Sequence, residues 1–399
     1  MFFASREKNT AKVISSSAIS KFGDMLFDYV NSVLLSGSKN GGWLLSIYQS
    51  SEVFTSVLFN FLGGALSDYK NRKNIIFICD LFSGSVCFLL SIFIPDDVFL
   101  YAVIVINIVF AIISSFRSPA YKAIFREIVN ENNLGKVNSI LETVNEIVQI
   151  GGPTLALMIA KFIGNRGALI LDSISFFISG FLLQKLFIIS PQKLNTKKTT
   201  TISQIFQGFH YLTLNRNIMV IVIFSSVINF IIAGYNLILP FSTYAFSGTK
   251  LKAYAVFLTA ESVGGLVGAS LSGLMKKDPS SNKLFILMML CGLSLIPCPQ
   301  LFLLTHSVIV VSVCIAMFNM FLGIYNIQFM TFVQINTKVE YIGRVFSIIF
   351  SIAILFMPFG TFFFKFVFNL KNQFDYSFLG LSLIFISLIS MTVNKFIKN

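Results

Sequence analysis

The chain has 399 residues, of which 55% are hydrophobic and only 12% are charged. A soluble globular protein has about 25% charged residues, so this composition excludes a water-soluble fold and indicates a protein whose surface faces lipid. The formal net charge is +13. This charge does not indicate nucleic-acid binding, because the basic residues lie in short loops between apolar runs and not on one soluble face.

Long apolar segments follow one another along almost the whole chain. A membrane-spanning helix needs about 20 mostly apolar residues. In the hydrocarbon core of a membrane, only helices and closed barrels satisfy all backbone hydrogen bonds. These runs are too long and too uniformly apolar for the alternating strands of a barrel. We therefore predict an all-α membrane protein with twelve transmembrane helices. The predicted helices span residues 13–36, 43–66, 75–94, 98–117, 136–162, 167–189, 217–246, 252–275, 284–304, 307–333, 343–367 and 374–394.

Basic residues are distributed unequally between the two sides of these segments. The side that holds both termini has about three times as many Lys and Arg residues as the other side, and such an excess marks the cytoplasmic face. The sequence therefore predicts a multi-pass protein of the cytoplasmic membrane with both termini in the cytoplasm. The longest polar stretch, residues 190–216, is predicted to be a cytoplasmic linker between two six-helix bundles at residues 1–189 and 217–399.

Similar short sequences recur in the two halves at nearly constant offsets. Gly64 and Gly273 are 209 residues apart, and Pro153 and Pro358 are 205 apart. The sequence GKVNSI that begins at residue 135 is similar to GRVFSI, which begins 208 residues later. Nearly equal offsets at equivalent positions predict a pseudo-symmetric pair of six-helix bundles with a substrate site between them near the midplane.

The segment Gly64–Lys73, with the sequence GALSDYKNRK, lies between the second and third predicted helices. It resembles the loop signature of the major facilitator superfamily, G-x-L-a-D-r-x-G-r-[RK], although Tyr69 and Asn71 depart from it. The resemblance implies that fold, and it implies that Asp68 engages the N-terminus of the eleventh helix, where free N–H groups favour an anion. The implied conformational gate consists of Gly64, Asp68, Lys70, Arg72, Lys73, Gly343 and Arg344. The alternative is an ordinary polar turn with cytoplasmic basic residues.

Two glycine motifs lie inside predicted helices. Gly151, Gly152 and Pro153 resemble the core of the Gly-Pro motif of drug:proton antiporters, although Thr154 follows where the motif has a further glycine. The motif implies a helix bend that helps to set the direction of transport; the alternative is a tolerated proline kink with close packing. Small residues also recur at helical spacing in the eighth predicted helix, which predicts close helix packing there. These residues are Gly264, Gly265 and Gly268.

Acidic residues lie deep inside several predicted helices. A carboxylate at the bilayer centre costs at least about 2.5 kcal/mol on insertion scales, so such residues usually have a function. The candidates for proton coupling or for the substrate cavity are Asp24, Asp28, Glu52, Glu142, Glu146 and Glu261. We predict that at least one of them exchanges a proton during transport. The alternative is that they only pair with neighbouring Asn, Ser or Lys side chains. Asp80 and Asp172 are interpreted as structural.

Three further segments are similar to the bacterial efflux branch that includes macrolide exporters: Ser118–Tyr121, Leu171–Phe176 and Gly343–Phe346. The resemblance implies a multidrug or antibiotic-resistance transporter that exports amphipathic small molecules in exchange for protons by alternating access. Export of a siderophore, a lipid or another metabolite remains open. A membrane-embedded enzyme or a non-transporting receptor is the alternative from another class. No catalytic set, metal site or cofactor motif is visible in the sequence, and we expect a monomer without a cofactor.

Overall fold

The computed structural model describes residues 2–69, 72–128, 131–184, 215–248, 252–274, 280–337 and 342–398. Within these ranges the chain is helical apart from short turns, and it contains no strand. Within the described residues, each of the twelve predicted segments falls on one or more helical elements, so the prediction of an all-α protein is confirmed. The predicted linker, residues 190–216, lies outside the described ranges except for its last two residues.

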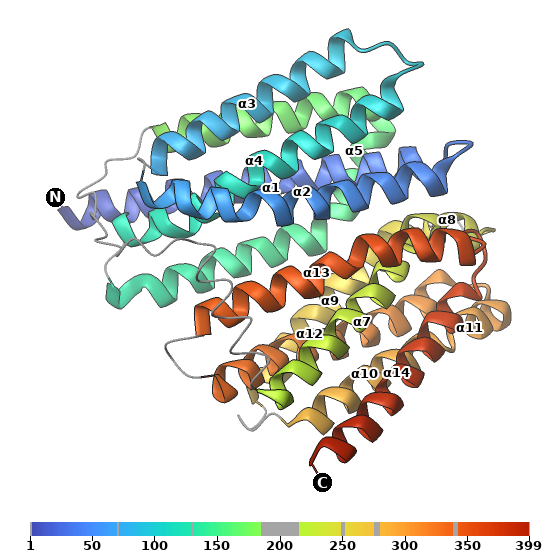
Figure 1. The fold of residues 1–399 in the computed structure, drawn as a ribbon. Helices are drawn as coiled ribbons and strands as arrows, with labels where there is room; N and C mark the ends of the chain where they lie inside the picture. The colour runs from blue at the N-terminus through green and yellow to red at the C-terminus, as the bar shows by residue number, and fades with distance from the viewer. Residues whose placement is uncertain are drawn as a thin grey trace. The chain divides into compact units, whose positions relative to one another are not determined.

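Contacts divide the chain into two compact units, Met1–Lys197 and Lys198–Asn399. Unit 1 contains α1 (Phe2–Ser36), α2 (Gly41–Tyr69), α3 (Arg72–Phe93), α4 (Phe99–Ile128) and α5 (Glu131–Gln184). Unit 2 contains α7 (Arg216–Ile238), η1 (Leu239–Phe241), α8 (Ser242–Ala245), α9 (Ala253–Leu274), α10 (Ser281–Leu295), α11 (Cys298–Thr305), α12 (Val308–Asn336), α13 (Ile342–Val367) and α14 (Asp375–Lys398). Figure 1 shows these helices in colours that follow the chain.

Eight helical stretches among the described residues are long and apolar enough to cross a membrane, and Ile352–Val367 is a shorter apolar helix. The stretch Ile218–Ala245 joins α7, η1 and α8 into one crossing, and Ser281–Thr305 joins α10 and α11. Helix α1 is not among the eight. It carries Lys21, Asp24 and Asp28 within two turns, and these charges make it the most polar candidate for a crossing.

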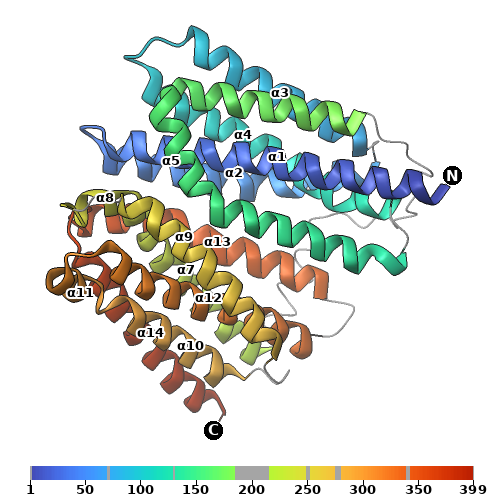
Figure 2. The same cartoon turned by 180° about the vertical axis from the view of Figure 1, so that it is seen from behind.

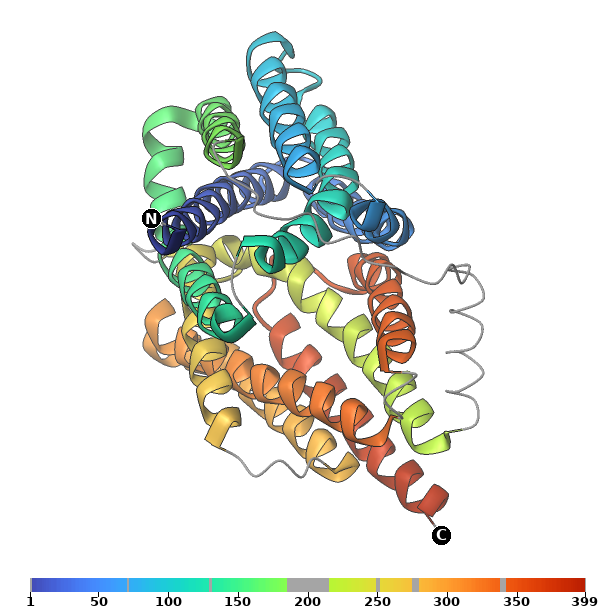
Figure 3. The ribbon, with the colours of Figure 1, turned by 90° about the vertical axis from the view of Figure 1, so that its left-hand side faces the viewer.

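The two units share one pattern of helix pairing. In unit 1, α2 packs on α4, α1 packs on α5, and α3 packs on both α4 and α5. In unit 2, α9 packs on α12, α7 packs on α13, and α10 packs on both α12 and α14. Figure 3 shows α3 beside α4, and Figure 1 shows α10 beside α14. Because equivalent helices pair in the same way, the six-helix arrangement occurs twice, as the repeated offsets predict.

The fifth and sixth predicted crossings are joined by a single non-helical residue. Gly164 has φ 69° and ψ −178°, a conformation that is essentially restricted to glycine. It falls between the predicted segments 136–162 and 167–189. Figure 2 shows α5 changing direction within its length, so that its last part returns alongside α3.

Helix α4 is longer than the sequence predicts. The prediction places its end at residue 117, whereas the helix continues to Ile128. The reason is that its apolar face continues: Ala120 and Ile124 are fully buried in a cluster with Val13 of α1 and Ile76 of α3. The extension places Arg117 inside a packed helix and not at a helix end.

Two of the three glycines in the α9 motif contact α12 directly. A Cβ atom added at Gly264 or Gly268 would overlap the backbone carbonyl oxygens of Ala316 or Met320, whereas one added at Gly265 would meet no heavy atom of the described residues within 4 Å. The predicted close packing therefore involves Gly264 and Gly268. Gly265 is the third glycine of the motif, and a larger residue there would not disturb the contact between α9 and α12.

This difference gives a test of the packing between α9 and α12. Replacing Gly268 by alanine should lower stability by about 1–3 kcal/mol, because the backbone of α12 has to move away. Replacing Gly265 by alanine should leave stability unchanged or raise it slightly, since alanine favours helix over glycine. Thermal unfolding of the two purified variants in detergent measures this difference. Equal midpoints for both variants would show that the close approach does not support the fold.

Candidate functional site

Three of the predicted acids gather on α1 and α2 of unit 1. Asp28 accepts a hydrogen bond of 2.8 Å from the hydroxyl group of the buried Tyr48. Glu52 interacts electrostatically with Asp28 and Asp24 and lies next to the amide of Asn107. Asp28 and Glu52 are exposed, and the side chain of Asp24 is 40% exposed. These carboxylates are therefore mutual neighbours, and each remains accessible.

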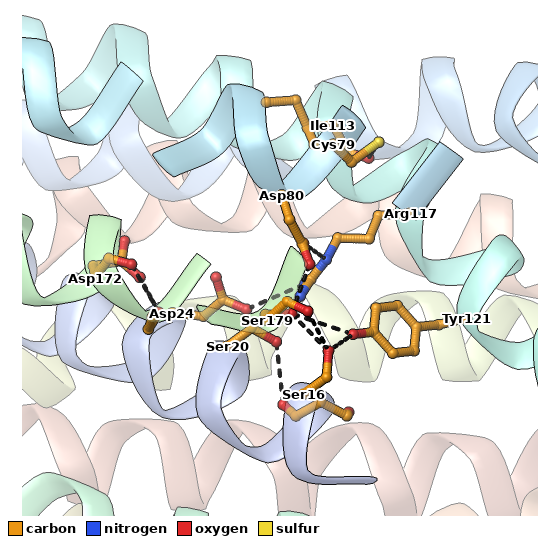
Figure 4. A network of polar contacts seen from close by, with 12 residues as sticks. Ser16, Ser20, Asp24, Cys79, Asp80, Ile113, Arg117, Tyr121, Asp172 and Ser179 are labelled. Carbon is orange, nitrogen blue, oxygen red and sulfur yellow. Dashed lines mark hydrogen bonds and ion pairs between the residues drawn. The ribbon is translucent and has the colours of Figure 1, made fainter. Parts of the chain in front are cut away.

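Arg117 of α4 connects this acidic cluster to the core of unit 1. Its Nε atom lies 2.6 Å from Oδ1 of Asp80, and its Nη1 atom lies 3.7 Å from Oδ2 of Asp24. Asp80 is fully buried, whereas Arg117 is 12% exposed. The guanidinium also lies over the rings of Tyr121 and Phe176, at 5.1 and 5.5 Å from their centroids. One buried cation is thus shared by a buried acid and an accessible acid, as Figure 4 shows.

Hydroxyl groups hold Asp80 in place on the side away from Arg117. Ser179 of α5 donates a hydrogen bond of 2.6 Å from Oγ to Oδ2 of Asp80. Ser16 of α1 lies 2.8 Å from the hydroxyl of Ser179 and 2.5 Å from the hydroxyl of Tyr121. These side chains come from α1, α3, α4 and α5, and Figure 4 shows them pointing toward one another. The contacts on both sides of the carboxylate agree with a structural role for Asp80.

Asp172 is a second fully buried acid in unit 1. Cys87 donates a hydrogen bond of 3.4 Å to its Oδ2 atom, and the hydroxyl of Ser175 lies 3.4 Å from its Oδ1 atom. Helix α1 passes very close at Gly23, where an added Cβ atom would overlap Ser175 and Asp172. This close approach makes Asp172 an electrostatic neighbour of Asp24 on the next position of α1.

Unit 2 holds a different acidic site, built around Glu261 of α9. The hydroxyl group of Tyr235, on α7, donates a hydrogen bond to Oε1 of Glu261. The same carboxylate interacts with the side chain of Asn319 on α12. The Tyr235 ring packs against Phe318 with a centroid distance of 4.7 Å and against Tyr376 at 6.1 Å. Helices α7 and α12 thus hold the carboxylate of α9 through neutral partners.

Unit 1 also contains a cavity of 710 Å³ at the turn of α5, lined by residues that include Leu34, Phe99 and Gly164. Arg166 at its rim pairs with Asp96, with 2.6 Å between Nη2 and Oδ1, and donates to the carbonyl oxygen of Ser91. Asp24, Asp28 and Glu52 do not line this cavity. The rim pair fastens the loop between α3 and α4 to the turn of α5.

Other predicted site residues have side chains outside the described part of the structure. This applies to Glu142, Glu146, Gly151 and Pro153 on α5, to Gly64 and Asp68 on α2, to Gly343 and Arg344 on α13, and to Lys70. Arg72 begins α3 and is buried, and Lys73 follows it. Gly152 packs against Met25 of α1, next to Asp24. The roles of the gate and of the Gly-Gly-Pro motif remain predictions.

Three residues of the site, Arg117, Tyr48 and Tyr235, are not among those predicted from the sequence. Arg117 lies at the end of a predicted crossing, where a basic residue is ordinary. Its position directly after a long apolar run, without other charges beside it, is the signal that could have identified it. The tyrosines carry no such signal, because aromatic residues are common throughout this chain.

The comparisons with known proteins agree with this architecture. Residues 14–361 match the family model of the Major Facilitator Superfamily. The chain belongs to the Major Facilitator Superfamily. Macrolide efflux protein A of Enterococcus faecalis is 24% identical over 311 residues, which cover 74% of this chain and 92% of that protein. YfiS of Bacillus subtilis, an uncharacterized MFS-type transporter, is 23% identical over 366 residues, which cover 88% of this chain and 84% of YfiS.

Solved transporter structures share the fold. The nucleoside transporter NupG superposes with a TM-score of 0.76 at 13% identity, covering 97% of this chain and 99% of NupG. A bacterial homologue of the iron transporter ferroportin gives a TM-score of 0.67 at 15% identity, covering 96% of this chain and 97% of that chain. At such identities the likeness shows the fold alone, and the family match identifies the chain as a multi-pass membrane transporter.

Proposed function

We propose that this superfamily member is a secondary active transporter that exports amphipathic small molecules, including drugs, from the bacterial cytoplasm in exchange for protons. The observation that carries the proposal is the sharing of Arg117 between Asp24 and Asp80. Relatives named as macrolide efflux proteins support the direction and the substrate class. The repeated six-helix units support alternating access, which in many transporters is a rocking of one repeat against the other.

We assign the proton step, which is the uptake and release of the exchanged proton, to Asp24. Its carboxylate is accessible and lies 3.7 Å from Arg117, whereas the Asp80 carboxylate is buried and lies 2.6 Å from the same guanidinium. When Asp24 takes up a proton, it loses its charge and its attraction to Arg117. The guanidinium is then held by Asp80 alone. A proton on Asp24 therefore changes the balance of forces between α1, α3 and α4.

The neighbouring acids connect this step to the substrate. Ionised Asp24, Asp28 and Glu52 repel one another, because like charges inside a protein are only partly screened. A proton on one carboxylate relieves the repulsion, and so does a cationic group of a bound compound. Because both ligands relieve the same repulsion, they compete, and competition of this kind couples export of the compound to entry of the proton.

The gate and the orientation belong to the same proposal. Asp68, near the end of α2, is proposed to bind the N-terminus of α13 at Gly343 and Arg344 when the cytoplasmic side is closed. Both termini are proposed to lie in the cytoplasm, and the excess of basic residues on their side supports this orientation. The Gly151–Pro153 motif is proposed to bend the first part of α5, beside Asp24 on α1.

Transport into energised inside-out vesicles tests the proposal directly. Vesicles that contain the protein should accumulate lipophilic cations and macrolides, and an uncoupler should reduce the accumulation to the level of vesicles without the protein. The reason is that export against a gradient requires the proton gradient as its energy source. Accumulation that persists in the presence of the uncoupler would contradict proton coupling. Export of a siderophore or lipid in place of these compounds would contradict the substrate class.

A further inference from the structure

The cavity at the turn of α5 lies where three connections between helices of unit 1 meet. Gly37 and Ser38, which join α1 to α2, line one part of it. Asp96, which lies between α3 and α4, lines another part, and the α5 junction at Gly164 lines the third. The cavity is therefore at the end of the unit where α1 ends, and in the proposed orientation this end faces away from the cytoplasm.

Exposed aromatic residues indicate that this end of unit 1 lies at a membrane surface. Trp43 lies in the first turn of α2, and Tyr101 lies in the first turn of α4; both side chains are exposed. Trp and Tyr are enriched at membrane–water interfaces, where the apolar ring and its polar group each find a suitable environment. Because both residues follow closely after connections that line the cavity, the cavity lies at the depth of the lipid headgroups.

Two opposite charges line the cavity, and each keeps an unused hydrogen-bonding position. Asp96 is 94% exposed; its Oδ1 atom accepts two hydrogen bonds from Arg166, whereas its Oδ2 atom accepts none from the described residues. The guanidinium has five N–H groups. Four are used, two on Asp96 and one each on the carbonyl oxygens of Ser91 and Ile94, so one N–H group remains. The amide of Asn165 also lines the cavity. The lining thus offers an acceptor for an ammonium group and donors for a phosphate.

Apolar side chains form the rest of the lining. Leu34, Leu100 and Ile163 line the cavity, and we call these three residues the apolar wall. Ile163 is exposed, and Phe162 beside it is 84% exposed. In a membrane protein such side chains lie against lipid chains, so the apolar wall continues into the lipid-facing surface. The volume of 710 Å³ is within the range of about 300–1,000 Å³ that is usual for small-molecule pockets. It can hold a headgroup and the first part of its chains.

We infer that this cavity binds a phospholipid whose headgroup carries both a phosphate and a primary ammonium group. The ammonium group donates to Oδ2 of Asp96, the phosphate accepts from Arg166 and Asn165, and the acyl chains leave along the apolar wall. The two charges of this headgroup are complementary to the two charges of the Asp96–Arg166 pair. An anionic headgroup without an ammonium group would meet Asp96 and the adjacent, exposed Asp97 without compensation. Binding of this lipid does not depend on which compound the protein exports.

Competition between two lipids on the purified full-length protein tests this assignment. Phosphatidylethanolamine and phosphatidylcholine with identical chains share the phosphate, but the trimethylammonium group of phosphatidylcholine has no N–H donor. In native mass spectrometry with equal amounts of both, wild-type protein should bind phosphatidylethanolamine in at least about threefold excess, since hydrogen bonds between charged groups are the strong ones. Asp96→Asn should reduce this ratio to about one. Asp97→Asn is the matched control, because it removes an adjacent acid that does not line the cavity and should keep the wild-type ratio.

Photo-crosslinking then locates the bound lipid. Phosphatidylethanolamine with a photoreactive group next to its headgroup should label peptides that contain Ser38, Leu100 or Ile163, and Asp96→Asn should reduce this labelling. Soluble phosphoethanolamine should not displace the lipid, because it has no chains to cover the apolar wall. Thermal unfolding checks that each variant is folded. Four results would each overturn the assignment: no preference in the wild type, an unchanged ratio in Asp96→Asn, stronger binding of phosphatidylglycerol than of phosphatidylethanolamine, or displacement by soluble phosphoethanolamine.

Discussion

Replacing Arg117 by glutamine is expected to produce the largest loss of stability among single substitutions in unit 1. Asp80 is fully buried and would be left without its cation, while Ser179 alone would still donate to it. Breaking a buried ion pair by removing one partner costs about 3–5 kcal/mol. The variant should unfold at a much lower temperature in detergent and should show no transport in vesicles.

Two further variants distinguish a loss of stability from a loss of proton coupling. The double variant Arg117→Gln with Asp80→Asn removes both charges of the buried pair and should regain most of the lost stability, because no unpaired charge remains. It should still fail to couple protons, since Asp24 has lost the guanidinium. Asp96→Asn, which removes the 94% exposed acid of the pair with Arg166, should change the unfolding temperature little. A stable and active Arg117→Gln protein would contradict the expectation that Arg117 is required for both stability and transport.

Replacing Asp24 by asparagine is expected to abolish concentrative transport while leaving a folded protein. The side chain is 40% exposed and 3.7 Å from Arg117, so loss of its charge removes a weak contact and not a buried pair. Without an acid at this position, protons cannot be exchanged for substrate. In proteoliposomes with an imposed proton gradient, accumulation should fall to the level of protein-free liposomes, and the unfolding temperature should stay close to that of the wild type.

Exchange of labelled for unlabelled substrate across the same liposomes provides the internal control, because exchange does not need the gradient. The Asp24→Asn variant should retain exchange. Lys21→Gln, one turn earlier on α1, should retain both exchange and accumulation. Accumulation by Asp24→Asn at the wild-type level would move the proton step to another acid, with Asp28 and Glu52 as the next candidates.

Most of the helices could be predicted from the sequence, because backbone hydrogen bonding in lipid leaves few choices for long apolar runs. The break at Gly164 was predicted between two such runs, and the repeated offsets indicated the two equivalent units. The end of α4 was not predicted. It depends on Ala120 and Ile124 finding apolar partners on other helices, and a hydropathy pattern contains no information about those partners.

The acids of the candidate site could be selected from the sequence because a carboxylate in an apolar helix is costly. Which side chains lie beside these acids in the folded protein could not be predicted to the same extent. The pairing of Asp80 with Arg117, and the hydrogen bond from Tyr48 to Asp28, arise where different helices meet. Spacing within one helix predicts a shared face, but it does not predict which side chain of another helix lies opposite.

The single-residue junction at Gly164 has a mechanical consequence for unit 1. The first part of α5 contacts α1 at Gly152, and the last part contacts both α1 at Gly23 and α3 at Gly84. Because the two parts are joined by one residue, α1 lies against both of them, and the last part connects α1 to α3, which carries Asp80. We therefore expect α1, α3 and both parts of α5 to move together when unit 1 changes conformation.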